Sequence, residues 1–172
     1  MQDVENLFLE VSKAIDERDI SAAKELLEEI LSIDPGYGRA HNHLGWIYET
    51  KIKDFERAKR HYELAIKFCK GTYPVVYVNF SYLLIEFGDY EKAIEIISEG
   101  LKTKEADKAT LQYQKGKIAE YQQDFKSALS QYELARKLSF NKEFHSMLEN
   151  EIARVKSKFS FWDKFLLWIK NP

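Results

Sequence analysis

The side chains with the widest chemical range in this sequence are its four histidines and its single cysteine. His41 and His43 are two positions apart, so on a helix they point in different directions and make a poor pair of metal ligands. Cys69 follows Phe68 and has no identifiable base beside it, which is typical of a small packed side chain rather than a nucleophile. We therefore expect no metal site and no catalytic residue.

Charged side chains are abundant, but their pattern is that of solvated helix faces. Carboxylates stand beside cations, as in Glu91-Lys92, and no glycine-rich phosphate loop is present. Lys and Arg total 26 against 28 for Asp and Glu, and this balance disfavours nucleic-acid binding, which needs a basic surface. These observations predict a protein that is not an enzyme, needs no cofactor and has no nucleic-acid partner.

The compartment follows from three weak signals. A single cysteine excludes an intrachain disulfide. The first residues carry Asp3 and Glu5, where an export signal would be basic, and no run of 18 apolar residues exists. We expect a cytoplasmic protein.

The element that must position any functional side chain is an internal repeat. Three columns of residues recur every 35 positions through the chain: an acidic column, an apolar column one residue later, and a small column three residues after that. The columns are Asp19, Asp54, Asp89 and Asp124; Ile20, Phe55, Tyr90 and Phe125; and Ala23, Ala58, Ala93 and Ala128.

Each repeat is predicted to be a hairpin of two amphipathic helices. In the first, residues 3–17 form one helix and a second runs to Ile33, capped by Asp19 or Ser21. Asp34-Pro35-Gly36 ends it, with Gly36 expected to permit a left-handed turn. A hairpin this small cannot bury its apolar faces alone, so neighbours must stack. The predicted boundaries are residues 4–36, 37–72, 73–105 and 106–140.

At these residues the chain resembles the tetratricopeptide-repeat family, which has a small residue and a Tyr in the first helix and an aromatic and alanines in the second. The second repeat matches with Gly45, Tyr48, Phe55, Ala58, Tyr62 and Ala65, and the fourth with Gly116, Phe125, Ala128, Tyr132 and Ala135. The resemblance covers about residues 4–140 and implies an all-α, right-handed α-solenoid of about four helical hairpins. The second repeat departs from the pattern by one extra residue in its turn, at Lys51-Ile52-Lys53. A period of 35 also resembles pentatricopeptide repeats, which read single-stranded RNA, but those need a basic path for phosphate.

In the family, the first helix of each hairpin lines a concave groove that binds peptides. The Lys/Asn pair of members that grip a C-terminal carboxylate is absent from the first repeat. Aromatic residues stand there instead, which favours a groove for an apolar or helical segment. A second interpretation stays open, in which several of these aromatics belong to the core between repeats. The candidate binding residues are Asn42, Trp46, Asn79, Tyr82, Tyr113, Lys117 and Tyr121.

Residues 141–172 form a separate C-terminal region. An apolar stripe from Phe144 predicts a capping helix over about residues 142–157, and a short terminal helix follows in residues 160–170. That last stretch is apolar on most sides, with Phe161, Trp162, Phe165 and Trp168 as candidate interaction residues. Four fates stay open: an extra cap, a mask over the groove, a contact with a second copy or another protein, and a membrane interface, which the local excess of cations favours.

The sequence therefore predicts a non-catalytic scaffold that binds a peptide or helical segment of a protein partner in an aromatic-lined groove. The alternative is a membrane-peripheral adaptor, or an oligomerising module such as a homodimer, that uses the apolar C-terminal tail.

Overall fold

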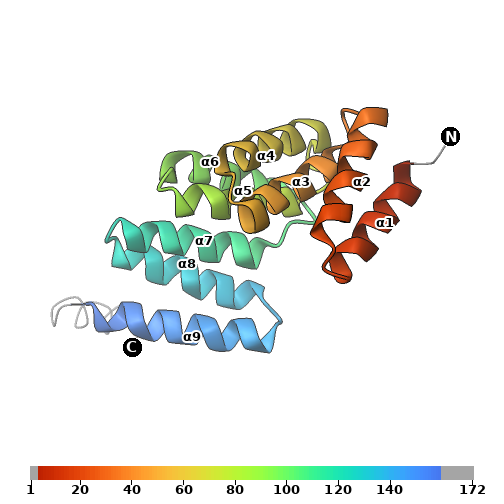
Figure 1. The fold of residues 1–172 in the computed structure, drawn as a ribbon. Coiled ribbons are helices and arrows are strands. Elements are labelled where there is room, and N and C mark those ends of the chain that lie inside the picture. The colour runs from red at the N-terminus through yellow and green to blue at the C-terminus, as the bar shows by residue number, and fades with distance from the viewer. Residues whose placement is uncertain (1–3, 160–172) are drawn as a thin grey trace. The chain divides into compact units, whose positions relative to one another are not determined.

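The computed structural model describes residues 4–159 (Figure 1). By its internal contacts the chain divides into two compact units, Met1–Phe87 and Gly88–Pro172. Within residues 4–159 the regular structure consists of nine α-helices and one short π-helix, without strands. Unit 1 holds α1 (Val4–Asp16), α2 (Ile20–Ile33), α3 (Gly38–Ile47), η1 (Tyr48–Ile52), α4 (Phe55–Cys69) and α5 (Val75–Glu86). Unit 2 holds α6 (Tyr90–Lys102), α7 (Lys108–Tyr121), α8 (Phe125–Leu138) and α9 (Lys142–Ser157). The all-α prediction is confirmed.

The recurring aspartates are the N-caps of the second helices. Asp19, Asp54, Asp89 and Asp124 each accept a hydrogen bond from the backbone N–H three residues later, at 3.0–3.3 Å. Each of these bonds satisfies a donor that the first helical turn leaves without an intrahelical partner. The residue before each cap has a left-handed backbone, with φ between 61° and 75°, at Arg18, Lys53, Gly88 and Gln123. The 35-residue period thus corresponds to one turn geometry that occurs four times, before α2, α4, α6 and α8.

The extra residue of the second repeat is absorbed by a π-helix. Gly45 precedes the capping Asp54 by nine residues, whereas Gly116 precedes Asp124 by eight. Between Gly45 and Asp54 the chain widens into η1, and it then turns at Lys53 with φ 64°. A π-turn holds one more residue than an α-turn, so the insertion leaves the cap and the following helix in place.

Small residues set how closely the paired helices approach. Ala23, Ala58, Ala93 and Ala128 have no exposed surface, as the repeat predicts. A Cβ on Gly45 would lie 2.7 Å from the ring of Tyr62, and one on Gly116 would lie 2.5 Å from the ring of Tyr132. These two glycines therefore admit the largest buried side chains of α4 and α8.

The prediction for Gly36 is wrong. Its φ is not in the left-handed region; the glycines there are Gly71 and Gly88. Instead, Asp34 takes an extended conformation before Pro35, and its Oδ1 accepts a hydrogen bond of 2.9 Å from the N–H of Gly36. The side chain of Asp34 makes the turn that we had assigned to glycine flexibility.

In unit 2, α9 packs on α8 over the stretch that the apolar stripe predicted (Figure 1). Leu148, Ile152, Val155 and Phe159 join a buried cluster with the core residues of α8. Among residues 4–159, no helix has both the length and the apolar character needed to cross a bilayer.

Candidate functional site

In unit 1, side chains of α3 contact side chains of α5 and of the residues just before it. Near the beginnings of the two helices, the guanidinium carbon of Arg39 lies 5.9 Å from the centre of the Tyr73 ring. In the middle, Asn79 Nδ2 donates a hydrogen bond of 3.2 Å to Asn42 Oδ1. Asn42 is buried and Asn79 half-buried, so this amide pair fixes the two helices against each other.

The next turn of each helix carries an aromatic residue. Trp46 is four residues after Asn42, and Tyr82 is three residues after Asn79, so both follow the amide pair by one turn. Trp46 is half-buried, with the ammonium of Lys51 lying 5.1 Å from its ring centre, and Tyr82 is 44% exposed. A cation already sits on the Trp46 ring, which shows that this ring can receive one.

A further turn along, η1 and α5 each present a carboxylate, Glu49 and Glu86 respectively. Glu49 Oε2 accepts a hydrogen bond of 2.5 Å from the hydroxyl of Tyr62. Burial raises the pKa of Glu49, the Tyr62 bond opposes that rise, and the negative charge of Glu86 adds to it. Among residues 4–159 neither Glu49 nor Glu86 has an ion-pair partner. We name the surface formed by Asn42, Asn79, Trp46, Tyr82, Glu49 and Glu86 the α3–α5 face.

At the other end of the α3–α5 face, near the beginning of α3, Arg39 contacts residues of α1. The guanidinium of Arg39 lies 4.0 Å from the centre of the Phe8 ring and forms a salt bridge of 3.1 Å with Glu5. Phe8 is buried and contacts Tyr37 and His43. The aromatic residue that α1 offers is thus part of the unit 1 core.

In unit 2, the predicted residues of α7 divide between core and surface. Tyr113 packs beside the buried cluster, with its ring 5.7 Å from that of Tyr132 and 5.8 Å from that of Phe144. Tyr121 is 55% exposed and stacks on Tyr90 at 5.8 Å, while Lys117 places its ammonium 5.4 Å from the Tyr121 ring centre. Tyr121 and Lys117 form the accessible part of this set.

Glu120 in α7 is the centre of an ionic cluster that holds α9. Its carboxylate accepts hydrogen bonds from Arg154, at 2.7 Å for the Nη2–Oε2 pair, from Lys158 at 2.9 Å and from the hydroxyl of Tyr132 at 2.9 Å. The bonds from Arg154, followed by those from Lys158 and Tyr132, lower the pKa of Glu120 to about 2. Glu120 and Glu49 each stand four residues after the glycine that covers the tyrosine they bind. That repeated spacing is the sequence signal for both acids, and neither of them is among the candidate binding residues predicted from the sequence.

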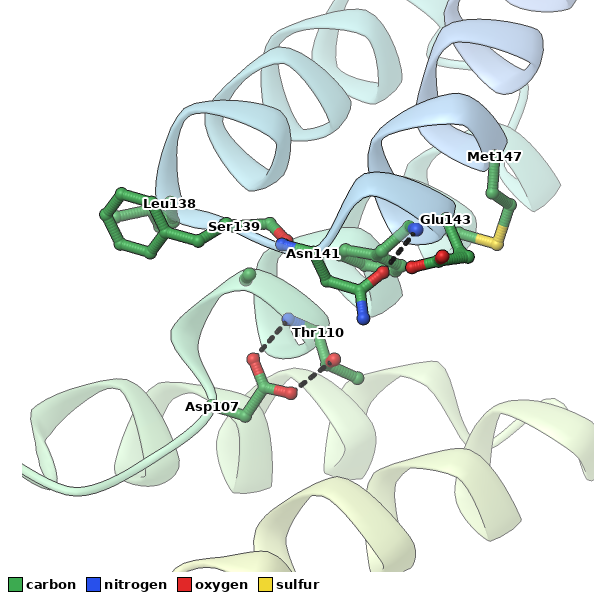
Figure 2. A pocket seen from close by; sticks show the side chains of 10 residues that line it. Asp107, Thr110, Leu138, Ser139, Asn141, Glu143 and Met147 are labelled. Atoms are coloured by element: carbon green, nitrogen blue, oxygen red, sulfur yellow. Dashed lines mark hydrogen bonds between the residues drawn. The ribbon is translucent and has the colours of Figure 1, made fainter.

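Unit 2 also contains a solvent-open cavity of about 630 Å³ where α7 begins and α8 passes into α9. Figure 2 shows that its polar groups already serve as helix caps: Asp107 bonds the N–H and hydroxyl of Thr110, and Asn141 bonds the N–H of Phe144. Phe140, on its rim, is 98% exposed. The capping bonds explain these polar residues without a ligand.

Two of the histidines, His41 and His61, form a hydrogen-bonded pair that the sequence analysis did not predict. His41 and His61 come from α3 and α4, and their Nδ1 atoms lie 3.0 Å apart. His41 Nε2 lies 3.1 Å from the carbonyl of Pro35, which can only accept, so Nε2 donates and Nδ1 of neutral His41 accepts from His61. Burial, together with the positive charges nearby, lowers the pKa of His61 to about 4, and burial also lowers that of His41. The twenty residues between them carry no pattern that predicts this contact.

The remaining candidates for chemistry are structural. Cys69 is buried, and its burial raises the pKa of the thiol, which disfavours the nucleophilic thiolate. Within the part of the chain that the structure describes, no three His, Cys, Asp or Glu side chains gather as metal ligands would. The tail residues Phe161, Trp162, Phe165 and Trp168 lie outside the described residues.

Comparison with known proteins identifies the repeat. The family model of the tetratricopeptide repeat matches residues 38–71 and 75–107. No curated protein matches the chain by sequence. Among solved structures, Pseudomonas aeruginosa PilF has a TM-score of 0.74 at 18% identity, over 90% of this chain and 72% of PilF. YrrB has a TM-score of 0.67 at 14% identity, over 91% of this chain and 88% of YrrB. Yeast Tom70 has a TM-score of 0.77 at 18% identity, and the matched region covers 91% of this chain but only 34% of Tom70.

At these identities the structural matches establish the fold, an all-α helical repeat of the solenoid class. Tetratricopeptide repeats are generally non-catalytic scaffolds for protein or peptide partners. The resemblance predicted from the sequence is confirmed: the chain carries tetratricopeptide repeats and takes the fold of the proteins built from them.

Proposed function

We propose that this protein is a non-catalytic scaffold that binds a peptide or helical segment on the α3–α5 face of unit 1. The observation that carries the proposal is the amide pair Asn42–Asn79, which fixes two neighbouring first helices with an aromatic residue on the next turn of each. A rigid, partly exposed aromatic pair offers apolar area to a partner at a small cost in conformational entropy. YrrB, which shares the fold, is a tetratricopeptide-repeat protein with an unusual peptide-binding site.

Within the face, the residues divide into two roles. Trp46 and Tyr82 contact the partner, because they carry accessible apolar surface. Asn42 is buried, so its role is to orient Asn79, whose remaining donor and acceptor face a peptide backbone. In unit 2, Lys117 and Tyr121 form a second contact surface, and Tyr113 contributes through packing.

The test is selection of ligands from a phage-displayed library of random dodecamer peptides, followed by calorimetry of the selected peptides. We expect Trp46→Ala with Tyr82→Ala to weaken binding at least tenfold while the helical circular dichroism stays unchanged. Phe140→Ala is the matched control, since it removes an exposed aromatic ring that lies outside both contact surfaces and should leave binding unchanged. Selected peptides that bind the Trp46/Tyr82 variant as tightly as the parent chain would refute the assignment.

A further inference from the structure

A tyrosine–glutamate pair of the same kind occurs within each of the two units. In unit 1 the hydroxyl of Tyr62 donates to Glu49, and in unit 2 the hydroxyl of Tyr132 donates to Glu120. The two pairs stand at the same place in their repeats, with Gly45 and Gly116 over the tyrosine rings. The chain therefore carries two copies of one carboxylate site.

Unit 2 shows which group this site receives. Arg154 and Lys158, which follow Glu120 by 34 and 38 residues, place a guanidinium and an ammonium on its carboxylate. The stem of Lys158 also brings its ammonium to 5.1 Å from the ring centre of Phe125. A carboxylate, a tyrosine hydroxyl and an aromatic ring together form the cation-binding arrangement.

In unit 1 no cation among residues 4–159 forms an ion pair with Glu49, and Lys53 acts on this carboxylate only from a longer distance. The residues that follow Glu49 by 34 and 38 positions are Leu83 and Phe87. Phe87 packs against Phe55 at 4.6 Å and is still 55% exposed. Instead of a cation, α5 adds a second carboxylate, Glu86, which is exposed and close enough to act on Glu49 electrostatically.

The geometry points to a specific partner for the α3–α5 face: a protein segment that carries an apolar or aromatic side chain and, about one helical turn later, an arginine or lysine. The apolar side chain would lie on Trp46 and Tyr82, and the cation would lie between Glu49 and Glu86. This inference rests on the proposed function and adds the charge of the ligand to it. Charge complementarity favours this partner, because both carboxylates lack an ion-pair partner among residues 4–159 and the equivalent Glu120 has two.

Three labelled alanine-rich helical peptides test the inference. Each carries one tryptophan and, four residues later, an arginine, a glutamine or a glutamate, and each is titrated into the full-length chain by fluorescence anisotropy. We expect the arginine peptide to bind about five- to tenfold more tightly than the glutamine peptide and the glutamate peptide to bind most weakly. The preference should shrink as salt is raised, because the carboxylates are only partly buried.

Substitutions of Glu49 and Glu86 test whether these two carboxylates cause the preference for the arginine peptide. Glu49→Gln with Glu86→Gln should remove the difference between the arginine and glutamine peptides, while Glu25→Gln, an exposed acid in α2, should leave it unchanged. Equal affinities of the three peptides, or no binding of the arginine peptide at millimolar concentration, would overturn the inference. If the peptides bind equally and Trp46→Ala abolishes that binding, the charge assignment fails while the proposed function stands.

Discussion

Acid should destabilise unit 1 through its buried histidines. Burial, followed by nearby positive charge, lowers the pKa of His43 and that of His61 to about 4 in the folded chain. Unfolded histidine titrates near 6.5, so between about pH 6.5 and 4 the unfolded chain binds more protons than the folded chain. The stability that these residues contribute is therefore present above about pH 6.5 and is lost as the pH falls toward 4.

The magnitude follows from the two pKa values. A difference between 6.5 and about 4 corresponds to at most about 3.4 kcal/mol for each histidine, at about 1.4 kcal/mol per pKa unit. Both rings are half-buried, so solvent screening reduces the expected loss to about 1–2 kcal/mol each. The His41–His61 hydrogen bond adds to the effect, since protonation of both rings would set two N–H donors against each other.

Urea unfolding followed by circular dichroism, at several pH values from about 7 down to about 4.5, measures the effect. In the variant His41→Phe with His61→Phe, the loss of unfolding free energy over this range should be smaller than in the parent chain by about 1–2 kcal/mol. The carboxylates are the same in both proteins, so their contribution to the pH dependence of the unfolding free energy cancels in this comparison. An NMR titration of the folded chain in which His61 protonates near pH 6.5 would refute the reasoning.

Three further predictions concern the repeat itself, and thermal or urea unfolding checks each of them. Asp124→Ala removes the cap of α8 and should cost about 1 kcal/mol; no loss would contradict the capping role. Gly116→Ala sets a methyl against the ring of Tyr132 and should destabilise by about 1–3 kcal/mol despite the better helix propensity of alanine, and a gain in stability would show that the ring can move. Lys53→Gly relieves a left-handed backbone and should stabilise by about 0.5–1 kcal/mol, with unchanged or lower stability as the contrary result.

The sequence predicts the local chemistry of the repeats well, because that chemistry is periodic. The capping aspartates and the buried alanines recur at one interval, and each performs the role that its residue type indicates. The extra residue at Lys51–Lys53 can also be seen in the sequence. Its structural form, a π-helix, arises because Asp54 must stay in its capping position, and helix propensities of the residues do not predict it. Gly36 was misassigned because the side chain of Asp34 competes for the same turn.

The candidate surfaces were less predictable, since they depend on contacts between helices. The family resemblance placed Asn42, Trp46, Asn79 and Tyr82 on the groove side of their helices, yet only the tertiary contact shows that Asn42 is buried against Asn79. Tyr113 illustrates the second interpretation, in which an aromatic of a first helix packs with its neighbours. The His41–His61 pair depends on the closeness of α3 and α4, which no spacing in the sequence encodes.

The role of the apolar C-terminal tail stays a prediction. Liposome co-sedimentation and analytical ultracentrifugation of the full chain and of a chain that ends at Phe159 distinguish its candidate roles. A membrane or dimer role requires the two proteins to differ, and equal behaviour would contradict both.

The central claim is that partners bind on the α3–α5 face of unit 1. The indole N–H resonance of Trp46, identified by its loss in Trp46→Phe, reports on that face directly when a selected peptide is added to the isotope-labelled chain. If partners bind on this face, this resonance and those of Tyr82 and Asn79 should shift with one saturation curve. Saturable binding that leaves these three resonances unmoved would contradict it.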